Sequence, residues 1–238
     1  MISVPDIGHV YPKSDLDADL RLESTPTYTS SGSCYFDGAA GRVTISAAAG
    51  IDALFGAGGS ISFWVKVASD GEGNYGRIFE SGGWKIFVLG ESGGNVQVRF
   101  DHNSGTNGEW VGPAASMAVG VWNHLALTYN GASIENNPVL YVNGQSVTVT
   151  ELTKPVAPIN ADNADKILGS NSAGDRTFHG NICNAGVWKG TILTQAQVRS
   201  VMAANSYAGV QAVVQPTAYY LLSVDGDDST GNYDGTIS

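Results

Sequence analysis

The stretch from residue 122 to residue 149 reads WNHLALTYNGASIENNPVLYVNGQSVTV and carries the clearest structural signal in the 238-residue chain. In its first segment, Leu125, Leu127 and Tyr129 alternate with smaller or more polar residues. A period of two is typical of a β-strand that buries one of its faces. We therefore predict a strand here, with these three side chains in the core.

The second segment contains the pair Asn143-Gly144 between two further alternating runs. Asn-Gly supplies the two positive-φ residues that a type I′ turn requires. Residues 139–142 and 145–149 are therefore predicted to fold back on each other as a β-hairpin. Together with the strand before it, this hairpin predicts an antiparallel sheet.

Similar alternation recurs along the chain. The runs 60–67 (SISFWVKV) and 95–101 (NVQVRFD) each place apolar residues at every second position. The runs 76–82 (GRIFESG) and 84–90 (WKIFVLG) meet at Gly82-Gly83, which predicts another hairpin. Many short strands separated by turns are typical of a two-sheet antiparallel sandwich, so the predicted fold class is all-β.

One short helix is predicted after these strands. Thr194 can cap it, and Gln197 completes a capping box three residues later. Val198, Val201 and Met202 form an apolar stripe that we expect to lie in the core. The alanine- and valine-rich segment that follows is predicted to be a loop.

Composition favours one large domain with an extended arm before it. Hydrophobic residues make up 42% of the chain and charged residues 14%, which is typical of a globular protein. We expect an arm over residues 1–31 and a sandwich over 32–238, in which 217–238 form a closing strand and tail. The apolar side chains that would dock the arm on its own domain or on a neighbouring subunit are Ile2, Val4, Ile7, Val10 and Tyr11.

The chain is acidic, with a formal net charge of −10 and a pI near 4.6. This charge repels phosphate backbones, so nucleic acid and anionic membranes are poor partners. No run approaches the ~18 apolar residues of a spanning helix, and the first residues lack the pattern of a secretory signal peptide. We expect a protein that is made and kept in a cell, or in a particle assembled there.

Cys34 and Cys183 are the two cysteines of the chain. Each lies in a predicted strand, with Phe36 beside the first and Ala185 and Val187 beside the second as inward-facing neighbours. Two cysteines are too few for a disulfide framework or a structural zinc site. Buried free thiols are the favoured interpretation, and a disulfide is the alternative.

Several stretches, in this order, resemble the laminin-G-like branch of the concanavalin A-like lectin/glucanase superfamily. They are YFDGAAGRVTIS (35–46), ISFWVKV (61–67), VWNHLALTYNG (121–131), LYVNG (140–144), ILGSNSAG (167–174) and FHGNICNAGVWKGTILTQAQV (178–198). The resemblance implies a jelly-roll sandwich. It also implies that the concave sheet, or the loops at one rim, binds glycans or protein ligands.

The chain departs from the family pattern in two places. Cys183 stands where the family usually has an acidic residue that holds the opening turn or an ion, which lowers the expectation of calcium. The run YYLLSVDGDDSTGNYDGT, which resembles the usual opening segment, here closes the chain. Because the termini of a closed sandwich tend to lie close together, Tyr219 to Val224 is predicted to pair beside the Cys34 strand or the Cys183 strand.

No catalytic pattern is present in the sequence. Glucanases of this superfamily carry a Glu-x-Asp-x-Glu run for acid and nucleophile roles, and this chain has none. A Gly-x-Ser-x-Gly nucleophile elbow is also missing, and the four histidines are isolated. His124, which lies on a strand, is expected to be a packed or hydrogen-bonded residue. We therefore expect a non-catalytic protein.

The loop DHNSGTNGEW (101–110) combines an aromatic side chain with polar partners, as a sugar site requires. Trp110 with Glu109, Asn107 and His102 is the first candidate for a glycan site, and Trp84 is the second. An indole in such a loop would equally plug one end of the sandwich or form a subunit contact. The sequence leaves these alternatives open.

Two oxygen-rich segments are candidates for calcium binding. Asp101 and Asn103 lie in the first, and Asp225 and Asp227 in the second. Neither matches an EF-hand loop, and Asx turns in solvated loops are the favoured interpretation. No cofactor is expected, with Ca²⁺ as the alternative.

These features predict a binding protein, in one of two settings. The first is a structural or decoration component of a virion, from a phage, which contacts other protein subunits as a homo-oligomer or on a capsid and has an adhesive role toward glycans. The alternative is a carbohydrate-binding lectin module of a cell-surface or secreted protein. The first setting predicts a protein of the virion that is made in the host cytoplasm, and the alternative predicts a location at the cell surface or outside the cell.

Overall fold

The computed structural model describes residues 27–28, 32–103, 107–158, 162–204, 206–223 and 225–238. Within these residues the strands are β1 (Thr27–Tyr28), β2 (Cys34–Asp37), β3 (Val43–Ile45), β4 (Gly59–Val67), β5 (Arg77–Ser81), β6 (Trp84–Ser92), β7 (Asn95–His102), β8 (Gly108–Val111), β9 (Met117–Ala118), β10 (Trp122–Tyr129), β11 (Val139–Val142), β12 (Gln145–Val147), β13 (Thr150–Thr153), β14 (Lys166–Leu168), β15 (His179–Lys189), β16 (Ala218–Tyr220) and β17 (Gly235–Ile237). The helices there are the 3-10 turn η2 (Glu72–Asn74), α1 (Gln195–Ala203) and α2 (Tyr207–Val213).

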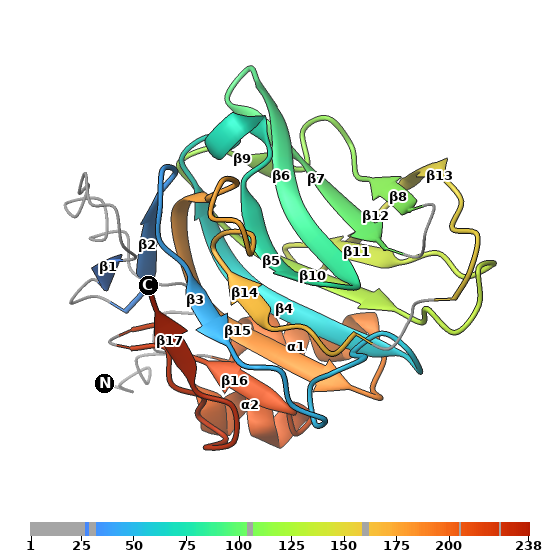
Figure 1. Cartoon of the computed structure of the whole chain (residues 1–238), viewed down its shortest axis with the longest axis vertical. Helices are drawn as coiled ribbons and strands as arrows, with labels where there is room; N and C mark the ends of the chain where they lie inside the picture. Colours follow the sequence, from blue (N-terminus) through green and yellow to red (C-terminus); the bar gives the residue numbers. More distant parts are fainter. Residues whose placement is uncertain (1–26, 29–31, 104–106, 159–161, 205, 224) are drawn as a thin grey trace, which may run out of the picture.

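The described strands form two antiparallel sheets that pack face to face (Figure 1). Sheet A has eight strands, in the order β1-β2-β15-β4-β10-β11-β12, with β16 also paired to β15. Sheet B has nine strands, in the order β13-β8-β7-β6-β5-β14-β3-β17, with β9 also paired to β7. The predicted two-sheet antiparallel sandwich is confirmed.

The stretch 122–149 forms one side of sheet A, from the inner strand β10 to the edge strand β12. Strand β10 pairs with β4 on one side and with β11 on the other, and β11 turns back into β12. Leu125, Leu127 and Tyr129 are all buried, as predicted. Asn143 and Gly144 have φ angles of 50° and 73°, which is the positive-φ pair of the predicted hairpin turn.

Aromatic side chains fill the space between the sheets. Phe55 lies against Trp84, with ring centroids 5.2 Å apart, and Phe100 lies against Tyr129 at 5.3 Å. Trp110 stacks on Phe100 at 6.0 Å. Edge-to-face and offset-stacked rings contribute attraction beyond the apolar area that they bury. This aromatic cluster, built from both sheets and one loop, is part of the core.

The two helices cover the other face of sheet A (Figure 1), and a second apolar cluster lies between them and the sheet. The capping box of α1 forms as predicted, and Val198 and Val201 are buried beneath the helix. The segment predicted as a loop is instead the helix α2, capped by Ser206. It is stabilised by packing that the local sequence does not reveal, since Val210 is buried against sheet A. No helix within the described residues is long and apolar enough to cross a membrane.

The C-terminal segment joins both sheets. Strand β16 pairs with β15, so the predicted placement beside the Cys183 strand is confirmed for Tyr219 and Tyr220. Regular pairing ends there, although the Asn184 amide still donates to the Leu221 carbonyl at 3.1 Å. The chain then crosses to sheet B, where β17 pairs with β3. The proposed docking residues of the arm, Ile2, Val4, Ile7, Val10 and Tyr11, lie outside the described residues.

Both cysteines are buried free thiols, as predicted. Cys34 faces the core between the sheets. Cys183 pairs with Trp64 across a register shift in β15, next to Asn184 with a φ of 51°. The shift turns Cys183 to the opposite face of sheet A from its expected neighbours Ala185 and Val187, so the expected inward orientation of this thiol is wrong. Burial raises the pKa of the Cys183 thiol.

The buried carboxylate of Asp228 organises the tail. It accepts hydrogen bonds from four backbone amides, those of Tyr219 at 2.7 Å, Thr230 at 3.0 Å, and Asn232 and Tyr233 at 3.2 Å each. The Thr230 hydroxyl also donates to it. One side chain therefore connects β16 to the turn that leads into β17.

We predict that Asp228→Ala lowers the free energy of unfolding by about 2–4 kcal/mol, because it leaves several amides without an acceptor. Chemical denaturation monitored by tryptophan fluorescence measures this change. The matched control is Asp227→Asn, since Asp227 is fully exposed and its pKa is raised by the neighbouring charge of Asp225. Equal stability of Asp228→Ala and the control would contradict the assigned role.

His124 is packed on the face of sheet A that lies away from the core. Its ring meets Trp64 edge to face, with centroids 5.4 Å apart, and its Nε2 forms a hydrogen bond with the Ser62 hydroxyl at 2.8 Å. Burial lowers the pKa of this imidazole from 6.5 to about 3. His124 is therefore a neutral packed residue, in agreement with its predicted role.

Because the unfolded chain binds a proton at His124 near pH 6.5 and the folded chain does so only near pH 3, acid destabilises the fold. As the pH falls from about 6.5 to about 3, this histidine lowers the free energy of unfolding by about 1.4 kcal/mol for each pH unit. Urea unfolding of the wild type and of His124→Gln at several pH values tests this. The free energy of unfolding of the variant should fall less steeply as the pH is lowered. Parallel pH dependences would contradict it.

Candidate functional site

The aromatic side chains predicted to bind a glycan are core residues. Trp110 and Trp84 are 1% and 0% exposed, and His102 is also buried. The Trp110 indole donates to the Asn137 side chain at 2.7 Å, and His102 Nδ1 bonds the Tyr129 hydroxyl at 2.7 Å. The prediction of an exposed platform at these three residues is therefore wrong, because strand alternation turns them inward.

The remaining members of that predicted site point elsewhere. Asn107 is partly exposed just before β8. Glu109 lies on the opposite face of β8 from Trp110, where its carboxylate is 2.5 Å from the Arg99 guanidinium. The structure thus separates the predicted polar partners from the predicted aromatic platform.

Basic side chains contact both residues of the first predicted calcium-binding pair. The buried Asp101 carboxylate is 2.6 Å from Arg99 Nε and 3.2 Å from Lys85 Nζ. Asn103 accepts from Lys85 at 3.4 Å and donates to the Gly82 carbonyl at 3.0 Å. These oxygens are engaged by side-chain donors, so this pair does not present a calcium-ligand set.

The second pair lies in the tail. Asp225 accepts from the Asp227 amide at 3.2 Å, which is the predicted Asx turn. The charge of Asp225, followed by desolvation and the charge of Asp234, raises the pKa of Asp227. Within the described part of the chain, no three His, Cys, Asp or Glu side chains form a metal-binding group.

The outer face of sheet B, which is turned away from the core, carries a dense array of polar side chains. In β6, Ile86 and Val88 belong to the core, whereas Lys85 and Phe87 lie on the outer face. The register places Lys85 beside Asp101 and Phe87 beside Arg99 on the neighbouring β7. Figure 1 shows β6 and β7 as two long curved strands that run together. Their alternation therefore produces both the core and this face.

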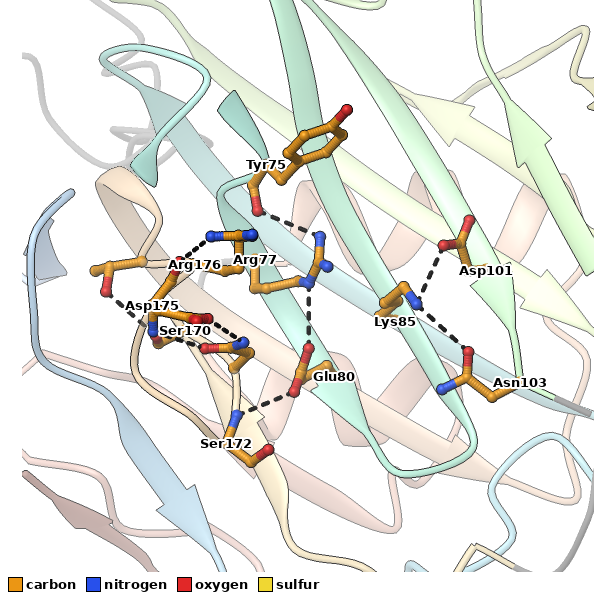
Figure 2. Close-up of polar contacts among 12 residues, drawn as sticks. Tyr75, Arg77, Glu80, Lys85, Asp101, Asn103, Ser170, Ser172, Asp175 and Arg176 are labelled. Carbon is orange, nitrogen blue, oxygen red and sulfur yellow. Dashed lines mark hydrogen bonds and ion pairs between the residues drawn. The ribbon is translucent and has the colours of Figure 1, made fainter. Parts of the chain in front are cut away.

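A β-bulge in β5 adds an ion pair to the same face. The register shift between Arg77 and Phe79 places both Ile78 and Phe79 in the core. As a result Arg77 and Glu80 both point outward, with Arg77 Nε 3.2 Å from Glu80 Oε2 (Figure 2). Bulges of this kind re-aim side chains near functional sites.

Phe87 is covered by arginines rather than by the opposite sheet. The Arg77 guanidinium lies 4.2 Å from the centre of its ring, and that of Arg99 lies 5.6 Å away. Tyr75, whose ring centroid is 6.1 Å from that of Phe87, is 43% exposed. Its backbone carbonyl accepts from Arg77 at 3.2 Å. Tyr75 thus gives this face an accessible aromatic ring (Figure 2).

A hollow of about 330 Å³ opens beside Glu80. Thr44 of β3 and Ile167 of β14 form part of its wall, and both lie on the outer face because their strand neighbours are in the core. The other lining residues are Arg42, Glu80, Ser81, Gly82, Ala164, Asp165 and Ser172. The hollow thus adjoins the Arg77–Glu80 pair and continues the polar face.

Hydrogen bonds hold the rim of this hollow. Glu80 Oε1 accepts from the Ser172 amide at 3.1 Å (Figure 2), and Arg42 Nη1 donates to the Ser172 carbonyl at 2.8 Å. Asn171 and Asp175 form two further hydrogen bonds that close the adjacent turn. Burial, opposed by the Ser172 amide and the charge of Arg77, raises the pKa of Glu80. The outer face and the hollow together form our candidate site.

Sequence reasoning missed most of this site. The alternation in WKIFVLG does place Lys85 and Phe87 opposite the core residues, and this signal was available. Tyr75 lies in a glycine-rich turn, where no period marks it. The hollow joins β3, β5, β14 and the loop at Ser172, which are distant in sequence. Only the folded arrangement brings these residues together.

Comparisons with known proteins agree with this architecture. A family model described as the concanavalin A-like lectin/glucanases superfamily matches residues 37–199. A comparison with curated proteins gives no match. Among solved structures, a protein from Bacteroides ovatus described as a candidate carbohydrate binder is 21% identical, with a TM-score of 0.60 over 87% of this chain and 57% of that chain. The present chain thus spans little more than half of that protein.

Two further structures share the fold. A heptameric pentraxin from Limulus polyphemus is 15% identical, with a TM-score of 0.53 over 85% of this chain and 95% of that chain. Domain 4 of an extracellular arabinanase from Geobacillus stearothermophilus, in complex with arabinotriose, is 22% identical, with a TM-score of 0.52 over 76% and 82%. On the family match over residues 37–199, this chain belongs to the concanavalin A-like lectin/glucanases superfamily.

Proposed function

We propose that this protein is a non-catalytic carbohydrate-binding domain, and that the outer face of sheet B with its hollow is the binding surface. The observation that carries the proposal is the array of paired donors and acceptors next to an exposed aromatic ring. Arg77 with Glu80 and Arg99 with Asp101 are held in place by their partners. Tyr75 lies at the edge of this array.

The chemistry of this surface suits sugars. A sugar presents hydroxyl groups that both donate and accept hydrogen bonds, together with apolar C–H groups. Charged donors and acceptors form the stronger hydrogen bonds to such hydroxyls, and an aromatic ring packs against the C–H groups. Because Arg77 and Arg99 are already ordered, little side-chain entropy is lost on binding.

Similar structures support a binding role. They include a candidate carbohydrate binder and an arabinanase domain in complex with arabinotriose. The virion-component role expected from the sequence has no such support, so we place glycan binding first. The carboxylates Glu80, Asp101 and Glu109 are each close to an arginine or lysine, which favours binding over acid–base catalysis.

We expect a glycan array, run with and without Ca²⁺, to identify bound glycans. For a glycan so identified, calorimetry should show that Tyr75→Ala and Arg42→Gln each weaken binding at least tenfold, or about 1.4 kcal/mol. The physical reason is the loss of the exposed ring in one variant and of a guanidinium at the hollow in the other. Thermal unfolding of each variant checks that the fold is kept.

Matched controls lie outside the proposed surface. Ile192 is an exposed apolar residue, and Arg199 of α1 donates to the Gly144 carbonyl at 3.0 Å. Ile192→Ala and Arg199→Gln should leave affinity unchanged. The proposal is wrong if no glycan binds, or if folded Tyr75→Ala and Arg42→Gln proteins bind as tightly as the controls.

A further inference from the structure

The ionic partners on the candidate site indicate which class of glycan it takes. Arg77 is paired with Glu80, and Arg99 with Asp101 and Glu109. Lys85 also lies 3.2 Å from Asp101. These three cations are therefore already neutralised by carboxylates, and an incoming anion would have to compete with them.

Arg42 is the cation that lines the hollow itself. Among the described residues, it is paired with no carboxylate, and its Nη1 donates to the Ser172 carbonyl at 2.8 Å. Two carboxylates, Glu80 and Asp165, line the same hollow. Because Glu80 is paired with Arg77, the remaining charges of the wall are those of Arg42 and Asp165, and the wall therefore carries no net positive charge.

The wider electrostatic field is negative, since the whole chain carries a formal charge of −10. A negative surface lowers the local concentration of anionic ligands and slows their association. A negatively charged sugar in the hollow would also face Glu80 and Asp165 at short range. Since Arg77 is already paired with Glu80, Arg42 alone would have to balance both Asp165 and the charge of the ligand.

A neutral sugar avoids this conflict. Its hydroxyls can accept from the Arg42 guanidinium and donate to the Glu80 or Asp165 carboxylate. The Ser172 hydroxyl at the rim can take either role. The mixture of donors and acceptors therefore matches hydroxyl groups better than it matches a carboxylate or sulfate.

From these contacts we infer that the hollow binds neutral glycans and selects against uronic acid, sialylated and sulfated ones. This inference rests on the proposed function and adds the chemical class of its ligand. The residue that determines the selection is Asp165, since Glu80 is paired with Arg77. Asp165 is the better test, because its exposed carboxylate accepts only the Ala47 amide, at 2.9 Å, in the described structure.

The experiment compares galactotriose with trigalacturonate. The two have the same ring arrangement, but each sugar of the first carries a hydroxymethyl group where each sugar of the second carries a carboxylate. The same comparison is then made for any neutral glycan found on the array and its C6-carboxyl form. We expect the neutral member to bind at least tenfold more tightly. Its affinity should change less than twofold between about 50 and 500 mM NaCl, because no ligand charge is screened.

The variant Asp165→Asn keeps an acceptor for the Ala47 amide and removes one negative charge. We expect it to narrow the preference for the neutral sugar about threefold. Glu135→Gln, in the loop between β10 and β11, removes the same charge where Glu135 pairs with exposed Lys154 and should leave the preference unchanged.

The two proposals fail in different ways. Tighter binding of the carboxylated sugar at this face, with affinity that falls as salt rises, would overturn the inference and leave the proposed function standing. An unchanged preference in folded Asp165→Asn would also overturn the charge argument. Failure of every neutral and acidic glycan to bind would overturn the proposed function itself.

Discussion

The alternation of side chains along β6 and β7 is the constraint on which the rest of the structure depends. Every second residue must enter the aromatic core, and the residues between must face outward. Ile86 and Phe100 fill the core, while Lys85 and Asp101 pair on the outside. The packing that stabilises the sandwich therefore also aligns the polar array, because core residues and site residues alternate along the same two strands.

The C-terminal tail extends this dependence to the hollow. Strand β17 pairs with β3, and the backbone of Ser238 exchanges two hydrogen bonds with Arg42, at 2.8 and 3.1 Å. Arg42 and Thr44 are in turn part of the hollow wall. Since Asp228 holds the turn before β17, a buried carboxylate in the tail supports the position of a proposed binding residue. The displaced tail is thus both a closing strand and a support for the site.

Sequence patterns predicted the framework better than the site. The Asn143-Gly144 turn and the burial of Leu125 follow from local rules, and both are present in the structure. The polar neighbours of Trp110 left a sugar platform, an end plug of the sandwich and a subunit contact as alternatives, and the structure shows that strand alternation turns its ring inward. His102 is in phase with Val98 and Phe100, so the same alternation could have predicted its burial. The hollow could not be predicted in this way, because its walls come from strands that are distant in the sequence.

Glycan binding on the outer face of sheet B is the proposal on which the assigned roles of Arg42, Glu80 and Tyr75 depend. A crystal structure of the protein with an array-identified oligosaccharide tests this most directly. We expect sugar hydroxyls within hydrogen-bond distance of Arg42 and Glu80, and a sugar ring near Tyr75. A sugar seated instead at the β10–β11 loop, or against the helices on sheet A, with the outer face of sheet B empty, would contradict it.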